Sequence, residues 1–418
     1  MTTATLAANA AHTAPQKITD KGAVWRLSLL LTCLYVVSYL TRINYGAVIS
    51  EIVSSEGIQK SLASLALTAS AVTYGFGQLV SGFLGDRINP KKLIFIGLLT
   101  TISMNILIPF CQTPYQMTAA WSINGLAQAF MWPPLVKIMA TLFTSEDYKK
   151  ACVIVTWGSS FGTIAVYALS PVCISLFGWR GVFAVSAFFA VLMSVIWMKK
   201  CRFENDNTMI VTSKITETNE KFGAKYLVLM GPIMLAIVLQ GILRDGVTTW
   251  MPSYISETFN LDRRAAILTG VILPIFSIGA IQLTSVIYRK FIKSELLLAS
   301  AVFFAGFISA LLLFSVNGKS APFSILFSAI LTACMYGVNI VMTCMVPPYF
   351  AKYGNISFMS GLLNFCTYIG SAASGAGLAL FSEKFGWSAT IVLWAVIALL
   401  GGLICLAVTK PWNKFKEN

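Results

Sequence analysis

The chain has 418 residues, of which 57% are hydrophobic and only 11% charged, and its mean hydropathy is +0.76. These values lie far outside the averages of soluble domains, so a soluble enzyme or binding module is excluded. The formal net charge of +14 does not indicate a nucleic-acid partner, because most of the Lys and Arg residues flank apolar segments on one side, as the positive-inside rule predicts.

Apolar runs long enough to cross a bilayer as a helix recur along the whole chain. We predict twelve of them, over residues 24–50, 62–85, 92–111, 116–144, 151–176, 181–199, 225–251, 265–288, 295–315, 321–350, 356–382 and 387–409. The first 22 residues contain no apolar h-region and do not form a cleavable signal peptide. We therefore expect an all-α polytopic protein of the cell membrane, with both termini in the cytoplasm and the lipid bilayer around it.

Three landmarks occur twice at nearly one offset. Arg42 and Arg244 are 202 residues apart (244 − 42), Pro133-Pro134 returns as Pro347-Pro348, and Phe177-Gly-Trp returns as Phe385-Gly-Trp. Such an offset indicates two parallel six-helix repeats. We expect a cytoplasmic tail (1–22), a first half (23–199), a cytoplasmic linker (200–224), a second half (225–410) and a short cytoplasmic tail (411–418).

The first predicted helix carries one polar stripe. Its members recur at spacings of three and four: Tyr35, Ser38, Tyr39, Arg42 and Tyr45. An arginine in the middle of a membrane span costs on the order of 2.5 kcal/mol or more unless it faces water or a partner. We expect the stripe to line an interior cavity; the alternative is a polar seam between packed helices.

The second helix ends in a recognisable motif, in which Gly82 is followed by Asp86-Arg87 and then by the basic pair Lys91-Lys92. This stretch resembles the loop between helices 2 and 3 of the major facilitator superfamily. Asn89-Pro90 within it resembles the organophosphate:phosphate antiporter branch. The resemblance implies a gating role for Asp86 and Arg87, since a carboxylate at a helix end can pair with cations and helix N-termini in one state and release them in another.

The fourth and fifth helices add further candidates. Asn124 and Gln128 precede Trp132-Pro-Pro, and Lys137 follows it. The two prolines remove backbone donors, so we expect a kink there. The basic residue after Trp-Pro-Pro also resembles the organophosphate branch; Lys137 could lie low in the cavity or extend to the inner surface. Gln78 on the second helix and Trp157, Ser160 and Phe161 on the fifth complete the first-half candidates.

The second half offers a matching set around Arg244. On the seventh helix these are Gln240, Arg244, Asp245 and Thr248, on the tenth Tyr336 and Asn339, and on the eleventh Asn364 and Tyr368. Adjacent residues of a helix point about 100° apart, so we expect Asp245 to point away from Arg244 and the cavity to be net positive. Asp245 is a candidate coupling residue.

The resemblance implies a substrate-binding role for Arg42 and Arg244. Organophosphate:phosphate antiporters carry one phosphate-binding Arg on helix 1 and one on helix 7, positions that Arg42 and Arg244 match. Helices 1, 4, 7 and 10 surround the central path in this fold, so the two side chains would face one another. Two departures weaken the case for a doubly charged sugar phosphate. Gln78 stands where the branch has a Lys, and Phe161 where several members have a His.

We therefore expect a monomeric secondary transporter that moves a small organic anion by alternating access, with organophosphate exchanged for phosphate. The alternative is a proton- or sodium-coupled symporter of an organic carboxylate or sugar acid. A sensor built on a transporter scaffold would bind ligand without flux. An enzyme is not expected, because no nucleophile–base pair stands out. No cofactor or metal is expected either, because the nine Cys are scattered and the single His12 lies in the tail.

Overall fold

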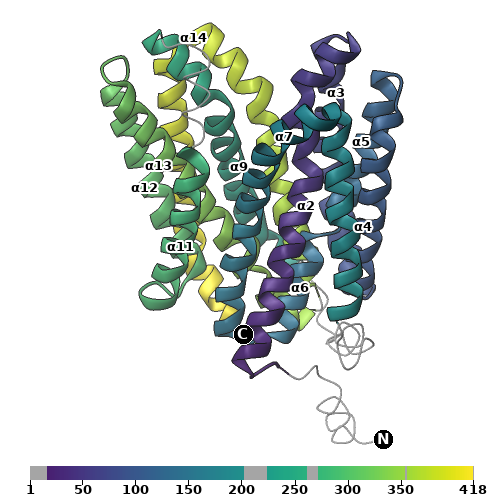
Figure 1. Cartoon of the computed structure of the whole chain (residues 1–418). Helices are drawn as coiled ribbons and strands as arrows, with labels where there is room; N and C mark the ends of the chain where they lie inside the picture. The colour runs from purple at the N-terminus through teal and green to yellow at the C-terminus, as the bar shows by residue number, and fades with distance from the viewer. Residues whose placement is uncertain (1–16, 202–223, 261–271, 354, 418) are drawn as a thin grey trace, which may run out of the picture. The chain divides into compact units, whose positions relative to one another are not determined.

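The computed structural model describes residues 17–201, 224–260, 272–353 and 355–417, which are almost entirely helical (Figure 1). The chain divides into two compact units. Unit 1 is Met1–Lys221 with Pro347–Leu362, and unit 2 is Phe222–Val346 with Leu363–Asn418. Most of the expected N-terminal tail and linker lies outside the described residues. The all-α prediction is confirmed for the part of the chain that is described.

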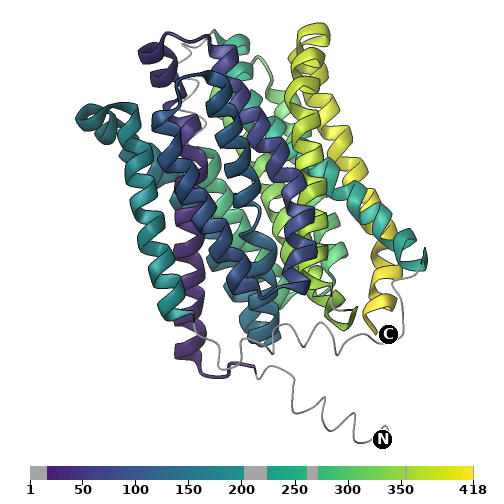
Figure 2. The same ribbon diagram turned by 90° about the vertical axis from the view of Figure 1, so that its right-hand side faces the viewer.

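Unit 1 is built from long helices that run side by side (Figures 1 and 2), with α2 packed along α7 and α3 along α5. Its elements are α2 (Lys21–Glu56), α3 (Lys60–Arg87), α4 (Pro90–Leu107), the 3-10 turn η1 (Ile108–Phe110), α5 (Pro114–Gln128), α6 (Trp132–Leu142) and α7 (Ser145–Lys200). The 3-10 helix η3 (Pro347–Tyr353) and the first turns of α14 (Ile356–Glu417) belong to the same unit.

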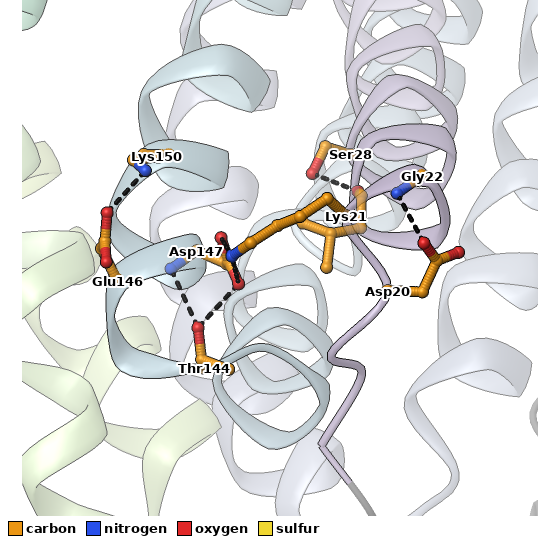
Figure 3. Close-up of polar contacts among 9 residues, drawn as sticks. Asp20, Lys21, Gly22, Ser28, Thr144, Glu146, Asp147 and Lys150 are labelled. Atoms are coloured by element: carbon orange, nitrogen blue, oxygen red, sulfur yellow. Dashed lines mark hydrogen bonds and ion pairs between the residues drawn. The ribbon is translucent and has the colours of Figure 1, made fainter.

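The helices of unit 1 begin at local sequence signals. The Asp20 carboxylate accepts the N–H groups of Gly22 and Ala23, which lowers the pKa of this residue. Thr113 caps α5 in a reciprocal box with Gln116. Figure 3 shows how the starts of α2 and α7 are joined: the Lys21 ammonium donates to both carboxylate oxygens of Asp147, each at 2.9 Å.

The kink expected at Trp132-Pro133-Pro134 is confirmed. The helix is interrupted between α5, which ends at Gln128, and α6, which begins at Trp132. The prolines occupy the first turn of α6, where a missing N–H costs least. The second half shows a related break, because α13 (Ala321–Ile340) passes through a π-turn, η2 (Val341–Met345), before the 3-10 helix that begins with Pro347-Pro348.

The repeated Phe-Gly-Trp sequence forms a sharp turn in both halves. Gly178 (φ 67°, ψ −174°) kinks α7 and Gly386 (φ 78°, ψ 172°) kinks α14. Residues with a side chain rarely adopt this backbone conformation. The tryptophan indole that follows donates to a glutamate in each case, Trp179 to Glu56 at 3.1 Å and Trp387 to Glu257 at 2.7 Å. The two halves of the sequence thus share this indole–glutamate hydrogen bond as well as the turn.

Unit 2 contains α9 (Ala224–Phe259), α11 (Ile272–Lys290), α12 (Glu295–Val316), α13, η2 and the remainder of α14. Here α13 packs against α9, α11 and α12. A fully buried carboxylate, Glu295, accepts from Tyr288, from the Trp412 indole at 2.8 Å and from the Lys416 ammonium at 2.8 Å. These bonds attach the end of α14 to the start of α12.

Eight helical stretches of the described residues are long and apolar enough to cross a membrane. The longest of them, Ser145–Lys200, has 56 residues, more than twice what a single span requires. Aliphatic and aromatic side chains lie on their outer surfaces, as in proteins whose solvent is lipid. The molecule is therefore an integral membrane protein.

Candidate functional site

Arg42, at the centre of the predicted stripe, lies among aromatic rings in unit 1. Its guanidinium carbon is 3.7 Å from the ring centre of Tyr74 on α3 and 5.4 Å from that of Tyr39. Tyr39 in turn contacts Tyr35, whose ring centre lies 5.0 Å from that of Trp132 on α6. A desolvated cation–π contact contributes about 2 kcal/mol, so these rings offset part of the cost of placing the charge at this depth.

The other part of the stripe is a packing seam. Ser38 donates to the Gln128 side-chain oxygen at 2.6 Å, and the Gln128 amide donates to Thr41 at 2.9 Å. The Asn124 amide donates to the Thr41 carbonyl at 3.1 Å. All four residues are buried, and their bonds tie α2 to α5. The part of the stripe around Ser38 is therefore a polar seam between packed helices, as the alternative predicted. That the face with Tyr35, Tyr39 and Arg42 lines a cavity stays a prediction.

The remaining candidates of unit 1 are dispersed. Tyr45 is fully buried against Trp121 and Phe183 and donates to the carbonyl of Ala63. Trp157 and Ser160 are half-buried, and Phe161 is 50% exposed. The segment of α7 that carries Trp157, Ser160 and Phe161 packs against α2 at Tyr35 and Tyr39, where Gly158 and Gly162 allow a close approach.

Gln78 is buried without a hydrogen-bond partner among the described residues for either side-chain amide atom. Its backbone lies where α3 crosses the start of α14, so close that a Cβ on Gly361 would come 2.2 Å from the Gln78 carbonyl oxygen. Gln78 thus lies in a helix contact in this conformation.

Arg244 and Asp245 form a bidentate ion pair in unit 2, which corrects the expectation that they point apart. The guanidinium Nε and Nη2 donate to the two carboxylate oxygens at 2.6 and 2.8 Å. Ser371 on α14 donates to the same carboxylate. The 100° angle applies to Cα–Cβ directions, and the long arginine side chain spans it. The Arg244 charge is compensated inside the unit, so the expected excess of positive charge is smaller by one.

Two tyrosines complete the surroundings of Arg244. The ring centres of Tyr336 on α13 and Tyr368 on α14 lie 5.6 and 5.9 Å from its guanidinium carbon. One turn before Arg244 on α9, the Gln240 amide donates to the carbonyl of Met335 at 3.0 Å. The Asn339 amide donates to the Gln240 side-chain oxygen at 3.5 Å. The structure thus brings together candidates from three separate predicted helices of the second half.

Two other second-half candidates have simpler surroundings. Thr248 donates to the carbonyl of Arg244, one turn back along its own helix. The Asn364 side-chain nitrogen is buried without a partner among the described residues.

The predicted gating residue Asp86 holds the start of α14 within unit 1. Its two carboxylate oxygens accept the N–H groups of Ser357 and Phe358 at 3.0 and 2.7 Å. The Lys137 ammonium lies 3.7 Å from Asp86 and donates to the carbonyl of Gly85 at 2.9 Å. Lys137 is buried, so it neither extends to a surface nor lines an open space in this conformation. Arg87 instead stacks on the ring of Phe83 at 3.3 Å.

Tyr74 and Thr41 are not predicted from the sequence as site residues, although each contacts one that is. Ser371, which contacts Asp245, does belong to the polar stripe of its helix. Tyr74 lies four residues before Gln78, one helical turn away, and that spacing was the available signal. Ser371 follows Asn364 and Tyr368 along one helical face. No group of three or more His, Cys, Asp or Glu residues that could hold a metal occurs among the described residues.

Partly buried arginines within the helices of a membrane protein of two related halves define a class, that of polytopic transporter-like proteins. The family model described as "Major Facilitator Superfamily" matches residues 31–375, and the chain belongs to this family. A solved structure of a proton:xylose symporter has the same fold, with a TM-score of 0.71, 12% identity and coverage of 94% of this chain and 95% of that one.

Two curated relatives align over most of their length. The glycerol-3-phosphate transporter of Bacillus subtilis is 24% identical over 92% of this chain and 91% of its own. The membrane sensor protein UhpC of Salmonella typhimurium is 24% identical over 93% of each. The resemblance to the organophosphate:phosphate antiporter branch is thereby confirmed.

Proposed function

We propose that this protein is a secondary transporter that moves a small organic anion across the cell membrane by alternating access, exchanging an organophosphate for phosphate. The observation that carries the proposal is the pair Arg42 and Arg244, which occupy equivalent positions of the two repeats and are each surrounded by tyrosines. A guanidinium fork suits a phosphate or carboxylate bidentately. The similarity to a glycerol-3-phosphate transporter supports the same substrate class.

The proposed topology is twelve membrane helices in two parallel repeats with both termini in the cytoplasm. Dividing α7 at Gly178 and α14 at Gly386, and joining α5 to α6 as one kinked span, gives six helices in each half of the sequence. The repeated turn and its indole–glutamate bond support this division. Labelling of single introduced cysteines from each side of the membrane would test it.

Within this proposal the substrate-binding residues are those around each arginine. In unit 1 they are Arg42 with Tyr35, Tyr39 and Tyr74, and in unit 2 Arg244 with Tyr336, Tyr368, Gln240 and Asn339. Asp86 and Lys137 act in gating, since a buried carboxylate that holds a helix N-terminus can be released as that helix moves.

Proton-coupled symport is the second candidate, and the Arg244–Asp245 pair favours it. Exchange is obligatory when the empty carrier must desolvate uncompensated arginines in order to reorient. Asp245 removes that obstacle for Arg244, and a carboxylate within a span can act as a proton carrier. A sodium-coupled or carboxylate-specific variant of this mechanism would use the same arginines.

Uptake and binding measurements in proteoliposomes distinguish exchange, symport and a sensor without flux. Uptake of labelled glycerol 3-phosphate that requires internal phosphate or organophosphate supports exchange. Uptake into anion-free liposomes that is driven by a proton gradient, and is lost in Asp245→Asn, supports symport and contradicts exchange. Saturable binding with no flux under either condition contradicts transport and favours a sensor, a role that the similarity to UhpC makes worth testing.

A further inference from the structure

We infer that Asp245 is a specificity-determining residue that makes this transporter select singly charged anions over doubly charged ones. The inference rests on the proposed function, because it concerns the substrate class of the same site. It starts from the ion pair in unit 2, in which Asp245 fills the Nε–Nη2 edge of the Arg244 guanidinium.

The ion pair is built into the unit. The side chain of Arg244 is 11% exposed and that of Asp245 27%. Ser371 donates to the carboxylate from α14, and Thr248 bonds the backbone carbonyl of Arg244 from one turn ahead. Because Arg244 and Asp245 are adjacent in the sequence, no movement between helices is needed to form the pair. An incoming anion therefore meets an arginine that already has a carboxylate.

The charges around Arg244 explain why singly charged anions are preferred. Within unit 2 the Arg244 guanidinium is paired with the Asp245 carboxylate, so the pair carries no net charge. An anion that binds to Arg244 is brought near the negative charge of Asp245. The repulsion grows with the charge of the anion, so a doubly charged ligand is disfavoured more than a singly charged one.

The geometry remains suited to a tetrahedral or planar anion. The Nη1 side of the Arg244 guanidinium is not used by Asp245, and the ring centres of Tyr336 and Tyr368 lie within 6 Å of the guanidinium carbon. Phosphate monoesters at their lower charge, sulfate monoesters and monocarboxylates all satisfy this description. The fully ionised phosphate monoester does not.

The test compares two esters of the same shape and different charge. At pH 8 glycerol 3-phosphate carries close to two negative charges, since the second pKa of a phosphate monoester is about 6, whereas glycerol 3-sulfate carries one. Dissociation constants for both are measured by competition on purified protein. We expect the wild type to bind the sulfate at least as tightly as the phosphate, and Asp245→Asn to shift the ratio of the two constants toward the phosphate by about tenfold or more.

Glu257→Gln is the matched control. It removes one carboxylate from the same helix, twelve residues away or about 18 Å, where Glu257 accepts from the Trp387 indole. The ratio should stay at its wild-type value. If Asp245→Asn is not recovered as folded protein, Asp245→Ser removes the same charge and is compared with the wild type in its place.

The outcomes distinguish this inference from the proposed function. Binding of both esters with a ratio that neither Asp245 variant changes overturns the inference alone. A wild type that prefers the phosphate over the sulfate by tenfold also overturns it. A folded wild type that binds no phosphate, sulfate or carboxylate overturns the proposed function, and the inference with it.

Discussion

The substitution Asp86→Asn tests the contact that holds the start of α14. It keeps an oxygen that can accept one N–H group but removes the negative charge. Lys137 then remains buried, with its side chain 5% exposed, and lacks the carboxylate 3.7 Å away. Removing one member of a buried ion pair typically costs about 3–5 kcal/mol. The separation is longer than in a close pair, so we take about 3 kcal/mol.

This cost can be read as a shift in thermal stability. An unfolding entropy of about 2.1 cal/mol/K per residue converts it to a fall of about 3 °C for a chain of this length. The assay is thermal unfolding in detergent with a thiol-reactive dye, which reports the seven buried cysteines as they become exposed. Glu146→Gln is the control, because it breaks an exposed pair, Lys150–Glu146 at 2.6 Å. Water screens a surface pair of this kind, so its loss should leave the transition temperature within about 1 °C of the wild type.

The decisive measurement is the double variant Asp86→Asn/Lys137→Gln. With both charges gone, no uncompensated cation remains, so its loss should be smaller than the sum of the two single losses by about 2 kcal/mol. Additive losses would refute the ion-pair argument. An unchanged transition in Asp86→Asn would refute the whole account of the contact, the two backbone hydrogen bonds included.

Three further predictions follow from other contacts. Gly361→Ala should lower the free energy of unfolding by about 1–3 kcal/mol and reduce transport, because the new methyl lies 2.2 Å from a backbone oxygen of α3. Gly377→Ala is the control on the same helix. Nothing lies within 4 Å of its new methyl, so it should behave as wild type in the same thermal and uptake assays. Arg42→Lys and Arg244→Lys should each reduce proteoliposome uptake by about tenfold or more with insertion intact, since lysine lacks the planar fork, and near-normal uptake would remove that arginine from the site. Glu295→Gln should speed trypsin cleavage in the last ten residues, because the carboxylate that binds the end of α14 is lost; equal rates would mean that packing alone holds that end.

The helices and their breaks were predictable because their causes are local. Proline position determines the interruption before α6, and glycine with a positive φ determines the turns at Gly178 and Gly386. The partners of the charged residues were not predictable in this way. Tyr74 meets Arg42 only because α3 packs beside α2, and helix packing is not encoded in the spacing of either segment. Asp245 was misjudged for a different reason: the helical wheel fixes Cβ directions and not the ends of flexible side chains.

One continuous helix carries two of the contacts described above. The backbone N–H groups of Ser357 and Phe358, at the first turn of α14, are bound by Asp86, and fourteen residues further on Ser371 donates to Asp245. Thermodynamic linkage is reciprocal: whatever factor a bound anion applies to the strength of the Asp86 contact, loss of that contact must apply the same factor to the affinity for the anion. A titration of Asp86→Asn with substrate therefore measures how strongly the Asp86 contact is coupled to anion binding.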